Sequence, residues 1–380
     1  MYKKIFMGIA AAAALTLVSC SSDDLNSLSD NSSKNEAISF DGYLGRSAVS
    51  VNGSRGSVLD INALKSTDTD KKGFGVFGYY NSSVTDHGSA PEQSFDANLF
   101  NNERVACPSE DTKWAYSPLK YWPAQGHIDF YAYAPYETGK TLNKKTSATS
   151  TTTTPTFDFT VADKVADQTD LLWAKAENKT KDNISSTDNK VKFQFAHALS
   201  RLGYTVKLKD AIDASVATVK LKRIALAGSA NENTKAFYTK ATIDLSKTST
   251  ATGLWSDYAV GRQNFEWFSG SHTVTTGINP IHPDENRVKD GDYLFVIPQK
   301  FKTGTDHLYV IVEYTIEYKS GTAKPTVSYK VSQELPYDFE QGKAYTINLT
   351  IGLTPIDFDV DVVTGWDPVN GTPIDIDSWN

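Results

Sequence analysis

From residue 37 onward, apolar and polar residues of this chain alternate with a period of two. Such alternation places every apolar side chain of an extended segment on one face, which is typical of a strand with one buried side. The longest stripe runs from Leu308 to Tyr318, and shorter ones cover residues 38–44, 73–80, 127–134 and 157–161. Amphipathic helical patterns are nearly absent, the best candidates being short turns near Ile61 and Ala211. The pattern predicts an all-β chain with few short helices.

The length and the turn punctuation predict more than one β unit. A chain of 380 residues is long enough for two domains, and its 19 Tyr and 18 Phe against 2 Met favour strands. Many short strands separated by turns are typical of β-sandwiches. We therefore expect two stacked sandwiches, over residues 38–165 and 166–380, with the boundary near residue 165.

Residues 1–19 resemble a lipoprotein signal peptide. Lys3 and Lys4 precede an apolar run that ends in Leu17-Val18-Ser19-Cys20, which looks like a bacterial lipobox. This predicts a lipid anchor on Cys20 and an outer-membrane lipoprotein; the alternative is an ordinary signal peptide with a chance cysteine. Residues 20–37 are rich in Ser, Asp and Asn, which predicts a flexible tether. With Cys20 lipidated, Cys107 has no disulfide partner.

Charge and motifs argue against several function classes. The net charge is −7 and no basic stripe is visible, which argues against nucleic acid as a partner. His197 lies between apolar neighbours and is expected to be a structural histidine. No H-E-x-x-H or G-x-S-x-G motif occurs, and Val362 and Pro368 replace the Gly and Glu that a calcium loop needs. We expect no catalytic residues, no cofactor, no metal and no enzymatic activity.

The C-terminal region carries the sharpest alternation in the chain. Apolar side chains at Ile356, Phe358, Val360 and Val362 alternate with three aspartates, and a second alternation follows at Ile374 and Ile376. One interpretation is a final edge strand whose aspartates discourage aggregation. The other is a strand that pairs with another molecule. The pattern by itself favours the edge strand.

Two local groups of aromatic residues could stack on sugar rings. They are Trp114-Ala115-Tyr116 and Tyr121-Trp122. Core packing explains such residues more often than ligand binding does.

Several segments in order resemble the fimbrillin family of type V pilins. They are the lipobox at Cys20, Gly73-Phe74-Gly75-Val76-Phe77, Lys120-Tyr121-Trp122-Pro123, Phe130-Tyr131-Ala132-Tyr133-Ala134-Pro135, Asp170-Leu171-Leu172-Trp173-Ala174, Val191-Lys192-Phe193, His197-Ala198-Leu199-Ser200 and Gly342-Lys343-Ala344-Tyr345-Thr346. The resemblance extends over nearly the whole mature chain.

The resemblance implies a precursor with two transthyretin-like sandwiches. In shaft subunits of the family, an arginine-specific protease removes the lipidated segment and the first strand, and a C-terminal strand of a neighbouring subunit fills the groove. Here the removed strand would be residues 38–44, which include Ile38 and Phe40, and cleavage would follow Arg55 or Arg46. The resemblance favours a donor role for the C-terminal region, and leaves open whether residues 356–362 or 374–377 insert.

The function so implied is that of a shaft subunit of an adhesive surface fimbria. Its partners would be other pilin subunits, with host or bacterial surface ligands as further candidates. It would leave the outer membrane for the fimbria after processing. The alternatives are a tip or anchor pilin, or a surface-anchored glycan-binding lipoprotein that uses Trp114 and Trp122.

Overall fold

The computed structural model describes residues 36–44, 64–65, 73–82, 97–107, 113–146, 151–184, 189–248, 252–277, 293–319, 322–352 and 357–364. These residues all belong to one compact unit, Glu36–Asn380. The fold is all-β, as the alternation predicts, and the described residues include one 3-10 turn, η2 (Val165–Asp167). The chain turns at Asp213–Val216, close to one of the two expected helical turns, without forming a helix there.

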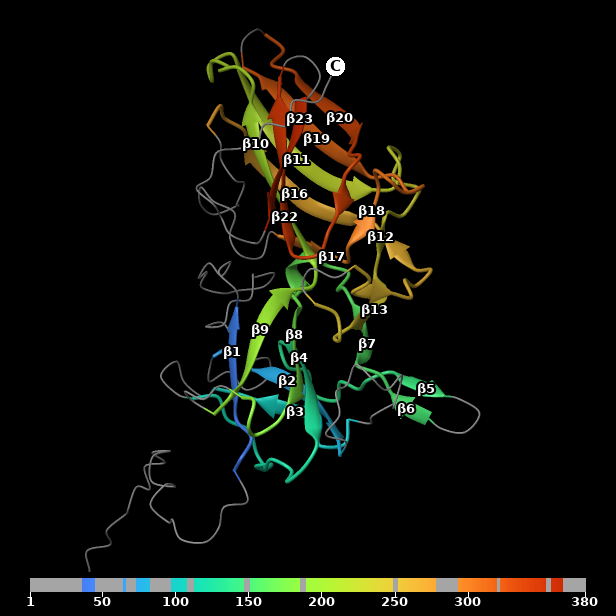
Figure 1. The fold of residues 1–380 in the computed structure, drawn as a ribbon. Helices are drawn as coiled ribbons and strands as arrows, with labels where there is room; N and C mark the ends of the chain where they lie inside the picture. Colours follow the sequence, from blue (N-terminus) through green and yellow to red (C-terminus); the bar gives the residue numbers. More distant parts are fainter. Residues whose placement is uncertain are drawn as a thin grey trace, which may run out of the picture. The chain divides into compact units, whose positions relative to one another are not determined.

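The N-terminal strands form one six-stranded sheet (Figure 1). Its spatial order is β1 (Phe40–Leu44), β9 (Val191–His197), β8 (Leu172–Lys179), β4 (His127–Ala134), β2 (Phe74–Asn81) and β3 (Phe100–Val105). β1 runs parallel to β9, whereas the other neighbours are antiparallel. The first strand therefore forms one edge of this sheet.

Both faces of the six-stranded sheet are covered by apolar side chains. In β4, Ile128 and Phe130 belong to one apolar cluster, while Tyr131 and Tyr133 belong to a second. Every residue of β4 is buried for this reason. A strand buried on both faces has apolar residues at nearly every position. This explains why apolar and polar residues alternate only weakly along β4.

Two four-stranded sheets make up the sandwich of the C-terminal half (Figure 1). One has the order β17 (Leu294–Val296), β10 (Ser200–Leu208), β22 (Lys343–Ile351) and β23 (Asp357–Thr364). The other has the order β16 (Phe265–Thr273), β11 (Ala217–Ala227), β19 (Tyr309–Tyr318) and β20 (Thr326–Glu334). Side chains of both sheets share one apolar cluster, so the core lies between them.

Short strand groups complete the architecture. They are β14 (Trp255–Ser256), β13 (Lys240–Asp244) and β7 (Thr156–Thr160); β12 (Phe237–Tyr238) and β15 (Arg262–Gln263); β18 (Gln299–Lys300) and β21 (Asp338–Phe339); and β5 (Lys144–Thr146) and β6 (Thr151–Thr153).

Strand pairing cuts across the expected boundary near residue 165. β8 and β9 come after that residue, yet both pair within the six-stranded sheet of the N-terminal strands. β7, which precedes it, pairs with β13 of the C-terminal half. The chain passes from the six-stranded sheet to the sandwich between His197 and Ser200. Sheet membership alone does not define a domain, so the division at residue 165 stays a prediction.

Candidate functional site

The first strand is an edge strand with a core side chain. β1 pairs with β9 from Phe40 opposite Val191 to Leu44 opposite Phe195, and no strand of the described residues pairs with its other side. Ile38 and Phe40 are 1% and 2% exposed, while Tyr43 on the same segment is 45% exposed. Edge strands are usually blunted with polar residues. This one is anchored in the core instead.

Phe40 lies inside a cage of four aromatic rings. Its ring centroid lies 5.3 Å from Phe100, 5.4 Å from Phe130, 5.5 Å from Tyr116 and 5.7 Å from Phe193. Two of these contacts are edge-to-face, the arrangement that aromatic pairs favour. The cage rings come from β3, β4, β9 and the loop before β4. A groove lined by these rings is thus filled by one side chain of β1.

The residues just before β1 are tied to the loop that precedes β4. The backbone N–H of Ile38 donates to the carbonyl of Lys120 at 2.8 Å, and the N–H of Trp122 donates to the carbonyl of Glu36 at 3.0 Å. The Tyr116 hydroxyl donates to the Ile38 carbonyl at 2.8 Å, and burial raises the pKa of Tyr116 to about 12. These are backbone contacts, so they hold the chain without selecting its side chains.

The two tryptophans expected either in the core or on sugar rings serve in packing. Trp122 is 5% exposed and meets Phe130 edge-on at 6.2 Å. Trp114 packs against the same apolar cluster and meets Phe74 at 5.0 Å. Burial confirms the core interpretation for Tyr116 and Trp122, whereas Trp114 is half-buried and Tyr121 is 48% exposed.

The 357–364 segment is part of the chain's own sandwich. β23 pairs antiparallel with β22 along its whole length, from Asp357 opposite Thr350 to Thr364 opposite Lys343. Val360 faces Ile347 in this register and is 2% exposed. Of the other predicted donor residues, Phe358 and Val362 take part in the same ladder through their backbones. The segment forms the sheet edge that its alternation favours.

The remaining predicted site residues lie outside the described residues. They are Cys20, Arg46, Arg55, Ile356, Ile374 and Ile376. Their roles in lipidation, processing and strand donation stay predictions.

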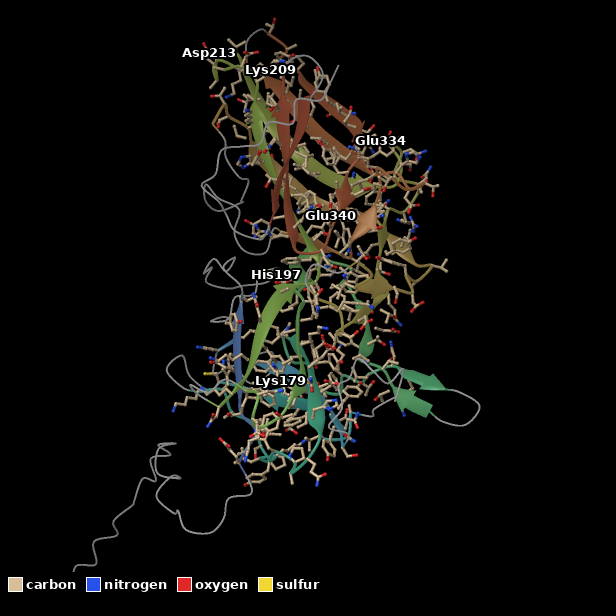
Figure 2. All side chains as sticks on the ribbon, viewed as in Figure 1. Lys179, His197, Lys209, Asp213, Glu334 and Glu340 are labelled. Carbon is tan, nitrogen blue, oxygen red and sulfur yellow. The ribbon has the colours of Figure 1, made fainter. Side chains whose placement is uncertain are left out.

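No candidate catalytic or metal centre emerges from the part of the chain that the structure describes. Nowhere in it do three or more His, Cys, Asp or Glu side chains gather as metal ligands. His197, labelled in Figure 2, is 7% exposed and its Nδ1 lies 2.8 Å from Asp170 Oδ2, so it is the expected structural histidine. Across the same residues, no helix has the length and apolar character to span a bilayer.

The sequence patterns did not predict that these four aromatic rings surround Phe40. Phe130, Phe193 and Tyr116 belong to segments singled out in the sequence, Tyr116 as part of an aromatic group, but Phe100 carried no distinguishing signal there. The four residues are far apart in the chain, and only strand order brings them together. A signal that covaried between these positions could have found them.

Comparison with known proteins is consistent with this architecture. The family model described as "Fimbrillin-like" matches residues 62–366. A solved fimbrial protein from Bacteroides vulgatus ATCC 8482 is 20% identical, with a TM-score of 0.61 over 88% of this chain and 100% of that chain. A conjectured cell adhesion protein from Bacteroides uniformis ATCC 8492 is 18% identical, with a TM-score of 0.43 over 87% and 98%. Among curated proteins, none matches significantly. The Bacteroides vulgatus structure has the same overall fold.

Proposed function

The chain belongs to the fimbrillin-like family, and from this premise we propose that it is a shaft subunit of a cell-surface fimbria that exchanges its first strand for one from a neighbouring subunit. The family is one of fimbrial and cell adhesion proteins, which act at the cell surface. The observation that carries the proposal is the burial of Phe40 in its ring cage on an edge strand. In this proposal β1 is a placeholder, and the lipid on Cys20 holds the precursor at the outer membrane until β1 is removed.

The position of β1 supports its removal by a protease. It lies at a sheet edge and has one strand neighbour, so its loss leaves the ladders between the other five strands intact. Arg46 and Arg55 follow it in the chain, so a cut after either would separate β1 from the rest of the fold. Among the described residues, the contacts of residues 36–44 would then hold the N-terminal fragment on the fold.

Exposing the apolar groove to water is unfavourable, which supports the replacement of β1 by another strand over its removal alone. Removal of β1 would expose the cage rings, which are apolar. Burying one Ile and one Phe is worth about 1.5–3 kcal/mol each, so an incoming strand with two apolar side chains could regain about 3–6 kcal/mol before ordering costs. Its backbone would pair with β9, as strands added to a sheet edge do.

Of the two candidate donor segments, residues 374–377 have more support than residues 356–362. Residues 357–364 already pair with β22, and Val360 is buried in the chain's own core, so their donation would open the sandwich. Ile374 and Ile376 have the same two-residue spacing as Ile38 and Phe40 and follow β23 in the chain. We propose that residues 374–377 fill the groove of the next subunit.

Controlled trimming tests this proposal. Treatment of the purified precursor with an arginine-specific protease should cut after Arg46 or Arg55 and produce polymers, visible by light scattering and electron microscopy. The double variant R46A/R55A should stay monomeric under the same treatment. A trimmed chain that keeps its C-terminus and remains monomeric would rule out strand exchange.

A mixing experiment tests the donor assignment. A trimmed chain that ends at Thr364 has an open groove but no 374–377 segment, whereas an untrimmed full-length chain has that segment but a filled groove. Mixed together, the two should stop at a one-to-one complex, measured by native mass spectrometry. Polymers from the shortened trimmed chain alone would show that residues 374–377 are not the donor.

The N-terminus of the protein recovered from intact cells separates a shaft role from an anchor role. A new N-terminus after an arginine supports assembly into the shaft, and an acylated Cys20 supports an anchored subunit. The glycan-binding alternative has less support, because Trp122 is buried and Trp114 packs half-buried against the same apolar cluster.

A further inference from the structure

A cavity of about 330 Å³ lies in the C-terminal half, and most of its lining residues have polar or charged side chains. Its wall combines the loop after β11, the strand β15 and the segment before β19, with Lys235, Arg262, Asp306 and His307 among the lining residues. Small-molecule sites usually have volumes of about 300–1,000 Å³, so this cavity has the size for one small ligand unit.

The wall of the cavity is fixed by internal contacts. Arg262 Nη1 lies 2.9 Å from Asp306 Oδ1, its Nη2 donates to the Tyr238 hydroxyl, and the guanidinium stacks on the Tyr238 ring at 4.0 Å. In the loop, Gly228 N–H donates to the Thr234 carbonyl at 2.9 Å and Thr234 N–H donates to the Ser229 hydroxyl at 3.0 Å. A site pre-formed in this way loses little entropy when a ligand binds.

Two side-chain pairs lie at the rim of the cavity. Arg262 is neutralised by Asp306, and His307 Nδ1 lies 2.6 Å from Glu334, which is labelled at the end of β20 in Figure 2. Within the described residues, this leaves Lys235 Nζ as a free donor, Asp306 Oδ2 as a free acceptor, and the hydroxyls of Thr234 and Thr305 free to do either.

The free groups select a class of ligand by elimination. A fully ionised phosphate accepts hydrogen bonds and cannot donate to Asp306, and an organic cation would face the unpaired charge of Lys235. An apolar ligand would leave the free polar groups without partners, which is unfavourable. Neighbouring hydroxyls of a sugar both donate and accept, and they carry no charge. We propose that this cavity binds one neutral monosaccharide unit of a surface glycan.

This proposal is independent of strand exchange. It assigns a ligand-binding role to a cavity that none of the assembly residues line, so a subunit could bind sugar whether or not it polymerises. It also differs from the tryptophan-based glycan hypothesis, which used residues of the N-terminal strands and loops.

Binding measurements on the purified full-length chain test it. A glycan array that presents neutral, sialylated and uronate-bearing glycans, with inorganic phosphate as a separate soluble probe, should show binding to a neutral glycan. Calorimetry with that glycan should then give a dissociation constant at least about tenfold weaker for Lys235→Ala and Asp306→Asn, as expected for losing hydrogen bonds to charged groups. Thr305→Trp should fill the cavity and abolish binding.

Two controls keep the result interpretable. Lys181→Ala removes an exposed lysine from the turn after β8 and should leave the dissociation constant unchanged. Lys235→Ala and Thr305→Trp replace side chains that make no described hydrogen bond, so their melting temperatures should match that of the unaltered chain. Absence of neutral glycan binding, binding of acidic glycans or phosphate alone, or binding that survives both of these variants would overturn the proposal.

Discussion

Phe40 combines an edge position with the burial of a core residue. Tyr43, three residues later in β1, is 45% exposed. Phe40 is therefore buried in the core while Tyr43 contacts solvent. Four rings from other parts of the chain surround Phe40 at centroid distances of 5.3–5.7 Å. The attachment of the first strand therefore depends chiefly on this side chain.

We predict that Phe40→Ala lowers the free energy of unfolding of the precursor by about 3–5 kcal/mol, because it empties the ring cage. The matched change Tyr43→Ala, in the same strand, should alter it far less, by about 1 kcal/mol at most, because Tyr43 is 45% exposed. Urea denaturation of the two variants measures both values. Equal losses would mean that β1 is not held by its inward side chain.

Glu232 gives the stability of the sandwich a pH dependence. Its carboxylate lies 2.6 Å from Arg223 Nη2 and 2.8 Å from Lys330 Nζ, and the hydrogen bond from Arg223 is the main reason that its pKa falls from 4.5 to about 2. Glu266 and Glu313 face the same guanidinium and compete for it. Because the folded pKa is the lower one, the stabilisation is present above pH 4.5 and is lost as the pH falls toward 2.

The variant Glu232→Gln should accordingly be less stable than the unaltered chain at pH 7, and this difference should shrink between pH 4.5 and 2. Urea midpoints measured across that range test the expectation. Glu340→Gln is a suitable control, since Glu340 is 60% exposed in its pair with Lys343 and surface pairs contribute little. A difference that stays constant down to pH 2 would contradict the assignment.

At the scale of elements, the last described strand, β23, belongs to the chain's own sandwich. β23 adds a full antiparallel ladder to β22 and places Val360 in the core. Residues 365–380 continue beyond that strand. Stability and assembly should therefore depend on different parts of the C-terminal region.

Two truncations test this separation. Ending the chain at Gly352 removes β23 and should destabilise the sandwich by at least about 1.5 kcal/mol, the value of burying one Val side chain. Ending it at Thr364 retains β23 and should leave the melting temperature unchanged. If both truncations melt alike, β23 contributes nothing to the folded monomer and could itself be the donated strand.

Alternation located the elements well where one face of a strand is buried. The stripes at 308–318 and 157–161 correspond closely to β19 and β7. The pattern is less informative for β11, which shifts register between Leu221 and Arg223, and for β20, most of which is exposed. A bulge changes which face a residue takes, so a strict period of two cannot follow it.

At the scale of the whole molecule, the first and last described strands each form the edge of a different sheet. In the proposed assembly, the groove under β1 receives and the tail after β23 donates, so the contact joins two different surfaces. Such head-to-tail contacts do not close on themselves unless the rotation completes a ring, and otherwise produce open filaments. A fimbrial shaft requires an arrangement of this kind.

The amino-acid sequence by itself determined the all-β class, the location of most strands and the resemblance to fimbrillins, because periodicity and short motifs are local properties. Only the tertiary structure decided that residues 172–197 join the N-terminal sheet, that Phe100, Tyr116, Phe130 and Phe193 enclose Phe40, and that Lys235, Arg262 and Asp306 line one cavity. Strand order depends on contacts between residues that are far apart in the chain. The free energy of such contacts includes a loop-closure entropy and a packing contribution, and a local sequence pattern encodes neither of them.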